Sequence, residues 1–407
     1  MNKNLKLLYI GFFLSSLGSG LTLPYLVIYL HEIRGFALST SGYLVAYMAI
    51  VGLVVAGPVG TLVDKYGPRK LLLFGILTQI IAVWSISFIE SLYFALVVLT
   101  LLAIGNGAVW PPQSTLIARL ATSEERSKAF SIQFLILNLG LGIGGIFSSF
   151  LVKIDDAKTF ELLYRIDGSS YIFYFLIVLF GLKRIGGPIS AKENVEKNSS
   201  YIELWKDKKL RRLIPVLFMF SIFGYGSIEV GFPAFATQVV GVEPAIVGWS
   251  YAANTLVIVF FQLITLKLTK NKSRISILMI TGAIWIISWV FLGLSSYLAL
   301  FYAILFLILS SAVFAIGETF YSTTAQPLLN DLAPEELRGR YNSLGGISWN
   351  VGGVIGPGIS GAMLGADLNN QWIFLIILGC FLGILGARTM RPLLSVEQDG
   401  RLFSKSN

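Results

Sequence analysis

The stretch GTLVDKYGPRK, residues 60–70, is a short charged turn between two long apolar segments. Its glycines, Gly60 and Gly67, permit a tight turn and a close approach of the flanking helices. Asp64 can cap a helix N-terminus or pair with a nearby cation. The stretch therefore predicts a helix, a polar turn and a second helix. The alternative is that its charges form only a solvated loop that orients the chain.

The composition indicates that most of the chain lies in lipid. The 407 residues are 55% hydrophobic and only 13% charged, with a mean hydropathy of +0.75. Soluble domains carry about 25% charged residues. Half that share leaves too few charges to coat a water-facing surface.

The chain contains twelve apolar segments of the length that a bilayer-spanning helix needs, about 20 residues. They lie at residues 5–30, 42–63, 71–89, 92–118, 129–152, 170–186, 213–236, 246–268, 275–295, 297–322, 343–365 and 371–390. We predict an all-α membrane protein with twelve transmembrane helices in two pseudo-symmetric six-helix bundles. The predicted divisions are an N-terminal bundle, a cytoplasmic linker, a C-terminal bundle and a cytoplasmic tail, at residues 1–187, 188–211, 212–392 and 393–407.

Positive charge gathers in the loops on one side of these segments. With the N-terminus in the cytoplasm, all but four of the 31 Lys and Arg residues fall on the cytoplasmic side. The four are Arg34, Lys153, Lys158 and Arg165. Because Lys and Arg are retained in cytoplasmic loops, we expect a multi-pass protein of the cell (plasma) membrane with both termini in the cytoplasm. The first apolar segment is too long for a signal peptide and lacks an Ala-x-Ala site, so we expect an uncleaved helix.

The two halves of the sequence resemble each other. A shift of 212 residues, which places Arg126 on Arg338, also places Asn138 on Asn350. The shift superposes two glycine pairs, namely Gly140 and Gly144 on Gly352 and Gly356. Internal repeats mark transporter folds, and glycines four residues apart allow close helix packing. We expect these two Gly-rich helices to pack across the interface between the halves.

The turn at residues 60–70 resembles the loop signature of the major facilitator superfamily. That signature has Gly, three residues, Asp, two residues and Gly before a basic cluster, between the second and third helices on the cytoplasmic side. The matching residues are Gly60, Asp64, Gly67, Arg69 and Lys70, while Pro68 departs from the usual Arg. The resemblance implies a conformational-switch motif in which Asp64 latches the two halves together. The corresponding stretch of the second half, residues 267–274, lacks the Asp and the glycines, which predicts only a solvated, orienting loop.

Other stretches resemble the twelve-helix drug:proton antiporter branch of that superfamily. They are LGSGLTLPY, AIGETFY, NDLAP and GRYN, at residues 17–25, 315–321, 330–334 and 339–342. Two features depart from the branch, because the fourth helix has no intramembrane Arg and the Gly-Pro pair stands in the eleventh helix instead of the fifth. The resemblance implies a secondary active transporter that exports hydrophobic or cationic small molecules in exchange for protons, by alternating access.

Two of the 22 acidic residues, Glu229 and Glu318, fall well inside predicted spans. A charged carboxylate costs at least a few kcal/mol at the bilayer centre, so such residues are usually functional and face the protein interior. Burial favours the neutral carboxyl, which suits a group that binds and releases protons. Both positions match acidic sites of the resembling transporters, and we predict both as proton-coupling acids. The alternative is a structural carboxyl that is hydrogen-bonded and permanently neutral.

Aromatic and amide side chains recur at helical spacing within the predicted spans. Such residues suit amphipathic or cationic ligands through apolar burial and cation–π attraction. The alternative is that they hold helices together. The predicted substrate-cavity residues are Tyr25, Tyr29, Asn106, Trp110, Gln113, Tyr251, Asn254, Tyr321 and Asn350.

The sequence argues against catalysis and against a metal or cofactor. Its one histidine, His31, has no cysteine near it, which argues against a zinc site, and Cys380 is its one cysteine. Neither a Walker loop nor a clustered catalytic set is present, so ion gradients are expected to drive transport. The expected partners are a small-molecule substrate, protons and lipid, without nucleic acid, and we expect a monomer. The alternative function is transport of a defined metabolite (a sugar, peptide, siderophore or lipid precursor) by symport or uniport.

Overall fold

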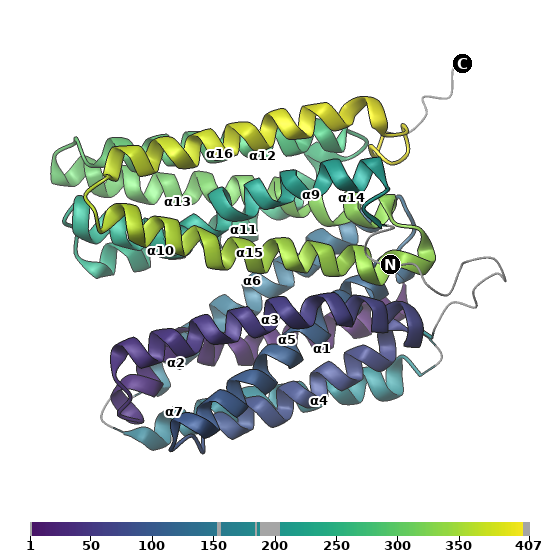
Figure 1. Cartoon of the computed structure of the whole chain (residues 1–407), viewed down its shortest axis with the longest axis horizontal. Coiled ribbons are helices and arrows are strands. Elements are labelled where there is room, and N and C mark those ends of the chain that lie inside the picture. Colours follow the sequence, from purple (N-terminus) through teal and green to yellow (C-terminus); the bar gives the residue numbers. More distant parts are fainter. Residues whose placement is uncertain (1, 153–155, 184, 188–203, 402–407) are drawn as a thin grey trace. The chain divides into compact units, whose positions relative to one another are not determined.

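Figure 1 shows the computed structural model of the chain, in which the described residues form helices joined by short turns. The structure describes residues 2–152, 156–183, 185–187 and 204–401. Most of the predicted linker and the last six residues of the predicted tail lie outside these ranges. Contacts divide the chain into two compact units. The first comprises Met1–Lys192 with Pro334–Gly346, and the second comprises Glu193–Ala333 with Ile347–Asn407.

The described residues of the first unit form six long helices. They are α1 (Lys3–Thr22), α3 (Leu38–Tyr66), α4 (Pro68–Ile86), α5 (Leu92–Leu120), α6 (Arg126–Leu151) and α7 (Ala157–Leu176). Three short turns of helix follow α1, namely η1 (Leu23–Tyr25), α2 (Leu26–Ile28) and η2 (Tyr29–Ile33), and η3 (Ile177–Gly181) extends α7. Helix α1 packs against α6 and α7, and α4 packs against α5 and α7.

The second unit begins with one long helical segment made of α9 (Lys208–Phe220), η4 (Ser221–Gly226), α10 (Ser227–Ala234) and η5 (Phe235–Val239). It continues with α11 (Pro244–Thr269), α12 (Arg274–Ser295), α13 (Leu300–Ser322), α14 (Ala325–Leu332) and α16 (Asn369–Met390). Helix α13 packs against α11 and α12, and α16 packs against α12 and α9. The short turns η6 (Glu335–Leu337) and η7 (Arg391–Leu393) precede α15 and follow α16.

Helix α15 (Arg338–Leu364) belongs to both units, because its residues up to Gly346 are assigned to the first unit and the remainder to the second. Its 27 residues span about 40 Å at 1.5 Å per residue, enough to cross a bilayer. Eleven other helical segments of the described residues are long and apolar enough to do so. The structure therefore confirms an all-α membrane protein, with α15 as the twelfth long segment.

The sixth predicted span, residues 170–186, is wrong at its start, because α7 begins at Ala157. Charged residues in this first part of α7 interrupted the apolar run on which the prediction relied. In the structure Glu161 accepts a hydrogen bond from Arg34 at 3.1 Å, and Asp167 is buried inside the unit. These acidic residues therefore lie within a helix, where Glu161 is paired with Arg34 and Asp167 is buried, and they do not indicate a loop.

The repeated glycines make close contacts within their own units. A Cβ on Gly140 of α6 would lie 2.6 Å from Ser16 Cβ of α1. A Cβ on Gly356 of α15 would lie 2.5 Å from the carbonyl carbon of Gly226 in η4. The expectation of close packing is confirmed, but the partners are α1 and η4. The expected packing across the interface between the halves stays a prediction.

Candidate functional site

Asp64 lies in the last turn of α3 and binds the first turn of α15. Its Oδ1 accepts a hydrogen bond from the Gly339 backbone N–H at 2.7 Å, and its Oδ2 accepts one from the Arg340 backbone N–H at 3.2 Å. The first N–H groups of a helix have no partner inside that helix. The Asp64 carboxylate satisfies two of these groups and adds negative charge at the positive end of the helix dipole.

Side chains around Asp64 strengthen this capping contact. Arg340 Nε lies 3.6 Å from Asp64 Oδ2 and 3.5 Å from the Thr61 hydroxyl. The side chains of Asp64 and Arg340 are 6% and 12% exposed, so water screens the pair weakly. A Cβ on Gly339 would lie 2.5 Å from Asp64 Oδ1 and 2.8 Å from the Gly60 carbonyl oxygen. The approach of α15 to α3 therefore requires glycine at residue 339.

The rest of the predicted switch motif shapes the turn into α4. Gly67 has a φ of 87°, a conformation that favours glycine, and it both ends α3 and precedes α4. Arg69 donates hydrogen bonds to the carbonyl oxygens of Val178 and Leu179 in η3, at 3.2 and 2.7 Å. Lys70 is exposed. Within the motif, Asp64 therefore caps α15, Gly67 forms the turn, and Arg69 is hydrogen-bonded to η3.

A second contact holds the start of α15. The Asn342 side-chain amide donates a hydrogen bond to the Thr115 hydroxyl of α5 at 3.1 Å and to the Arg338 carbonyl oxygen at 2.9 Å. Both Asn342 and Thr115 are buried. Asn342 stands in the quoted GRYN stretch, but its sequence position does not reveal a partner in α5.

Glu318 lies on α13 and faces α11 inside the second unit. Its Oε2 accepts a hydrogen bond from the Asn254 side-chain amide at 2.7 Å, and the residue is 8% exposed. Asn254 also lies 3.4 Å from the Ser311 carbonyl oxygen. Among the described residues, Glu318 has no ion pair within 4.0 Å. The structure therefore brings together one predicted proton-coupling acid and one predicted cavity residue.

Polar contacts continue along these two helices toward the end of α13. The Thr265 and Thr319 hydroxyls lie 2.8 Å apart, and the Gln262 side-chain amide donates a hydrogen bond to the Ser322 hydroxyl at 3.0 Å. We call Asn254, Gln262, Thr265, Glu318, Thr319 and Ser322 the α11–α13 seam. The seam places one carboxyl group in a row of uncharged hydrogen-bonding groups.

Comparison with known proteins settles the family. Residues 8–308 and 283–398 match the family model described as Major Facilitator Superfamily. The chain belongs to the major facilitator superfamily. It is therefore a multi-pass membrane transporter of a family that carries small molecules.

The transporter is similar to several known proteins. An uncharacterized MFS-type transporter, YhjO of Bacillus subtilis, is 23% identical over 380 residues, which cover 93% of this chain and 90% of YhjO. The quinolone resistance protein NorA of Staphylococcus aureus is 34% identical over 151 residues, which cover 36% of this chain and 38% of NorA. A bacterial homologue of the iron transporter ferroportin, solved in an outward-facing state, aligns with a TM-score of 0.79 at 13% identity, covering 96% of this chain and 100% of that chain. This last likeness shows the fold alone.

An aromatic cluster lies beside the seam of the transporter. The Tyr225 ring centroid is 5.7 Å from that of Tyr321 and 4.5 Å from that of Trp349. The Trp285 ring centroid lies 5.6 Å from that of Tyr321. Trp285 is fully buried, whereas Trp349 is 49% exposed, so one end of the cluster is accessible. Predicted cavity residue Tyr321 is thus part of an aromatic wall next to Glu318.

The three predicted cavity residues on α5 differ in burial. Asn106 and Trp110 are exposed, and Asn106 accepts a hydrogen bond from the Gln79 side chain at 2.6 Å. Gln113 is fully buried and accepts a hydrogen bond from the Tyr174 hydroxyl at 2.6 Å. Gln113 therefore helps to hold α5 to α7, and its place in a substrate cavity stays a prediction.

The remaining predicted residues occupy varied positions. Tyr29 is fully buried, and its hydroxyl accepts a hydrogen bond from Arg34 at 2.8 Å; Tyr25 is half-buried against Phe160. Tyr251 is partly exposed, with its hydroxyl 3.3 Å from the Ile228 carbonyl oxygen, and Asn350 is half-buried on α15.

Glu229 lies on α10, but its side chain is outside what the structure describes. Within the described residues, no group of three His, Cys, Asp or Glu side chains could hold a metal ion.

Proposed function

We propose that this transporter exports hydrophobic or cationic small molecules in exchange for protons, by alternating access. The observation that carries the proposal is the buried Glu318 carboxyl, which has an amide donor from Asn254 but no ion pair among the described residues. A carboxyl in such a place favours the neutral form and becomes a charged acceptor when it loses its proton. A cationic substrate could then replace the proton as its partner.

The surroundings of Glu318 support a hydrophobic or cationic substrate. Tyr321 and Tyr225 supply ring faces, which attract cations, and Trp349 supplies an accessible apolar surface. The partial similarity to a quinolone resistance protein favours export of toxic compounds. Under this proposal Glu229 is the second proton-coupling acid.

Two experiments test the proposal, namely drug susceptibility of cells and proton-driven transport in vesicles. Cells with and without the gene would be compared on a panel of toxic compounds, with and without a protonophore. Glu318→Gln keeps the size of the side chain and removes its proton exchange, and we expect proton-driven transport to fall at least tenfold. Glu90→Gln, at an exposed loop residue, is the matched control and should transport normally.

Two outcomes would contradict the proposal. Unchanged coupling in both Glu318→Gln and Glu229→Gln would exclude these acids as proton carriers. An unchanged susceptibility to all compounds of the panel would favour a transporter of a defined metabolite.

We also propose that Asp64 controls the change of state through α15. Gly339 and Arg340 belong to the second sequence repeat but contact α3 in the first unit. Because α15 continues from the first unit into the second, release of its first turn would free the helix to move. A state in which Asp64 binds α15 would then be favoured by the two hydrogen bonds.

A further inference from the structure

Asp167 is a buried carboxyl group inside a span, and the function proposed above does not use it. It lies in the middle of α7 and is 2% exposed. Its Oδ2 accepts a hydrogen bond from the Thr22 hydroxyl of α1 at 2.6 Å. Its Oδ1 is buried and has no hydrogen-bond partner among the described residues.

This arrangement is poor for an ionised carboxylate. A carboxylate offers about four acceptor positions, and buried acceptors without donors are costly. Asp167 has one hydroxyl donor, and among the described residues no cation balances its charge. A protonated carboxyl needs fewer donors and carries no charge, so the neutral acid fits this site.

The groups around Asp167 are uncharged. Helix α1 presents Thr22 and Gly18, and beside the neighbouring Gly168 the Trp84 ring of α4 fills the position of a Cβ. The titratable neighbours on α7 are the tyrosines Tyr164 and Tyr171. The nearest cation in sequence, Arg165, instead packs on the Phe88 ring and pairs with Glu161.

Gly18 makes the space that the carboxyl occupies. A Cβ on Gly18 would lie 2.6 Å from Asp167 Oδ1 and would overlap the Ser170 hydroxyl. The unpartnered oxygen and the Ser170 hydroxyl therefore approach the same point on α1. Any larger residue at 18 would displace both groups.

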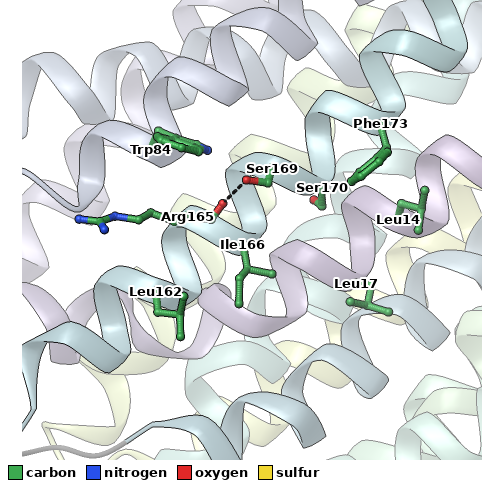
Figure 2. Close-up of a pocket in the computed structure, with 9 residues that line it drawn as sticks. All are labelled: Leu14, Leu17, Trp84, Leu162, Arg165, Ile166, Ser169, Ser170 and Phe173. Atoms are coloured by element: carbon green, nitrogen blue, oxygen red, sulfur yellow. Dashed lines mark hydrogen bonds between the residues drawn. The ribbon is translucent and has the colours of Figure 1, made fainter.

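A cavity reaches Ser170, three residues from Asp167 on α7. It has a volume of about 450 Å³ and lies among α1, α4 and α7 (Figure 2). Ser170 and Ser169 line it together with Arg165, and Figure 2 shows the Ser169 hydroxyl bonded to the Arg165 carbonyl oxygen. Most of its lining is apolar, and its polar groups lie on α7, where Arg165, Ser169 and Ser170 offer hydrogen-bond partners to water. Ser170 is thus shared between the cavity wall and the surroundings of Asp167.

We propose that Asp167 is a proton-binding site of the first unit, separate from Glu318, and that it exchanges its proton with water in the cavity beside Ser170. On uptake the proton forms an O–H bond with the unpartnered Oδ1, and on release that bond breaks and the proton passes to water. The inference rests on the proposed proton coupling only for its role in transport, because proton binding at Asp167 can be measured without a substrate.

Infrared difference spectroscopy of the reconstituted full-length transporter tests the site directly. A step from acid to alkaline buffer removes the C=O band of each carboxyl that loses a proton. We expect a band that is lost in Asp167→Asn and persists in Glu318→Gln. Thr22→Val removes the hydrogen bond to Oδ2 and should shift the frequency of the same band.

A transport readout follows the spectrum. In proteoliposomes, Asp167→Asn should move one proton fewer per cycle than the wild type. Glu161→Gln, on the same helix but partly exposed, is the matched control and should keep the wild-type ratio.

The two proposals can fail separately. If Asp167→Asn gives the wild-type infrared spectrum, or if the band does not shift in Thr22→Val, Asp167 does not exchange a proton and the inference is overturned. The Thr22→Val result decides the matter should Asp167→Asn fail to fold. If the band is present but transport in the wild type is independent of the proton gradient, the proposed function fails and the proton-binding site remains.

Discussion

Asp64 illustrates how one side chain can hold a helix that is distant in sequence. Its two carboxylate oxygens accept from two consecutive backbone N–H groups, those of Gly339 and Arg340. Hydrogen bonds to a charged group contribute about 1.5–3 kcal/mol each, more than neutral ones. The contact also requires that Gly339 carries no side chain, because Asp64 and the Gly60 carbonyl oxygen occupy that space.

Asp64→Asn should weaken the hold on α15. The amide replaces one acceptor oxygen by a donor that faces a backbone N–H, so one bond is lost and a repulsive contact is created. We expect a loss of about 2 kcal/mol, or about 30-fold in the population of the state that contains the contact. Cysteine accessibility along α15 and the transport rate would measure it. Lys70→Gln, at the exposed end of the motif, should change neither, and an unaltered α15 in Asp64→Asn would refute the capping role.

Gly339→Ala should reproduce the effect of Asp64→Asn. Its Cβ would lie 2.5 Å from Asp64 Oδ1 and 2.7 Å from a methyl group of Val63, so α15 must move away. Gly346→Ala on the same helix meets no atom within 4 Å and is the control. Because both changes break one contact, the double variant Asp64→Asn with Gly339→Ala should be little worse than either single variant. Additive effects would show that the two residues act separately.

At the level of elements, the N-terminus of α12 is capped from the tail. Asp399 Oδ1 accepts from the Ser273 hydroxyl at 3.0 Å and from the Ile275 backbone N–H at 3.1 Å. The Arg274 side chain forms a buried ion pair with Asp331. The prediction of a merely solvated loop at residues 267–274 is therefore wrong for its last residues. The acid that the second motif lacks in sequence is supplied from a position more than a hundred residues later.

Asp399→Ala should destabilise the second unit through α12. Loss of a capping side chain costs about 1 kcal/mol, and loss of the half-buried Ser273 contact adds to that cost. We expect a lower midpoint of thermal unfolding for the detergent-solubilised transporter. Glu397→Ala changes an exposed acid of the same turn and should leave the midpoint unaltered. Equal midpoints for both variants would show that the tail does not stabilise α12.

Element boundaries and element faces differ in how well the sequence predicts them. Long apolar runs predicted most spans, because lipid demands apolar length whatever the neighbours are. The face that each polar residue presents depends on which helix lies beside it. Helical spacing grouped Gln113 with Asn106. Gln113 is nevertheless buried and hydrogen-bonded to Tyr174 of α7, whereas Asn106 is exposed.

At the level of the whole molecule, the distribution of Lys and Arg predicts the orientation in the membrane. The single cysteine allows a direct test, since Cys380→Ala leaves a background without thiols. In that background, Lys270→Cys follows α11 and Ala299→Cys precedes α13. We expect a membrane-impermeant maleimide to label Ala299→Cys in intact cells and Lys270→Cys only after permeabilisation. The opposite pattern would reverse the predicted topology.

The sequence alone determined the solvent, the helical class, the repeat and the family, because these follow from hydropathy, spacing and a local motif. It also pointed to Asp64 through the motif, and to Glu318 because a charge inside an apolar run is conspicuous. Only the tertiary structure decided their partners, Gly339 and Asn254, and only it placed Asp167 inside a span with Thr22. The physical reason is that a hydrogen bond between distant residues depends on which helices are neighbours, and that choice is made by packing. For the opening stretch at residues 60–70, the sequence predicted the turn and its acid, and the fold decided that the acid caps α15.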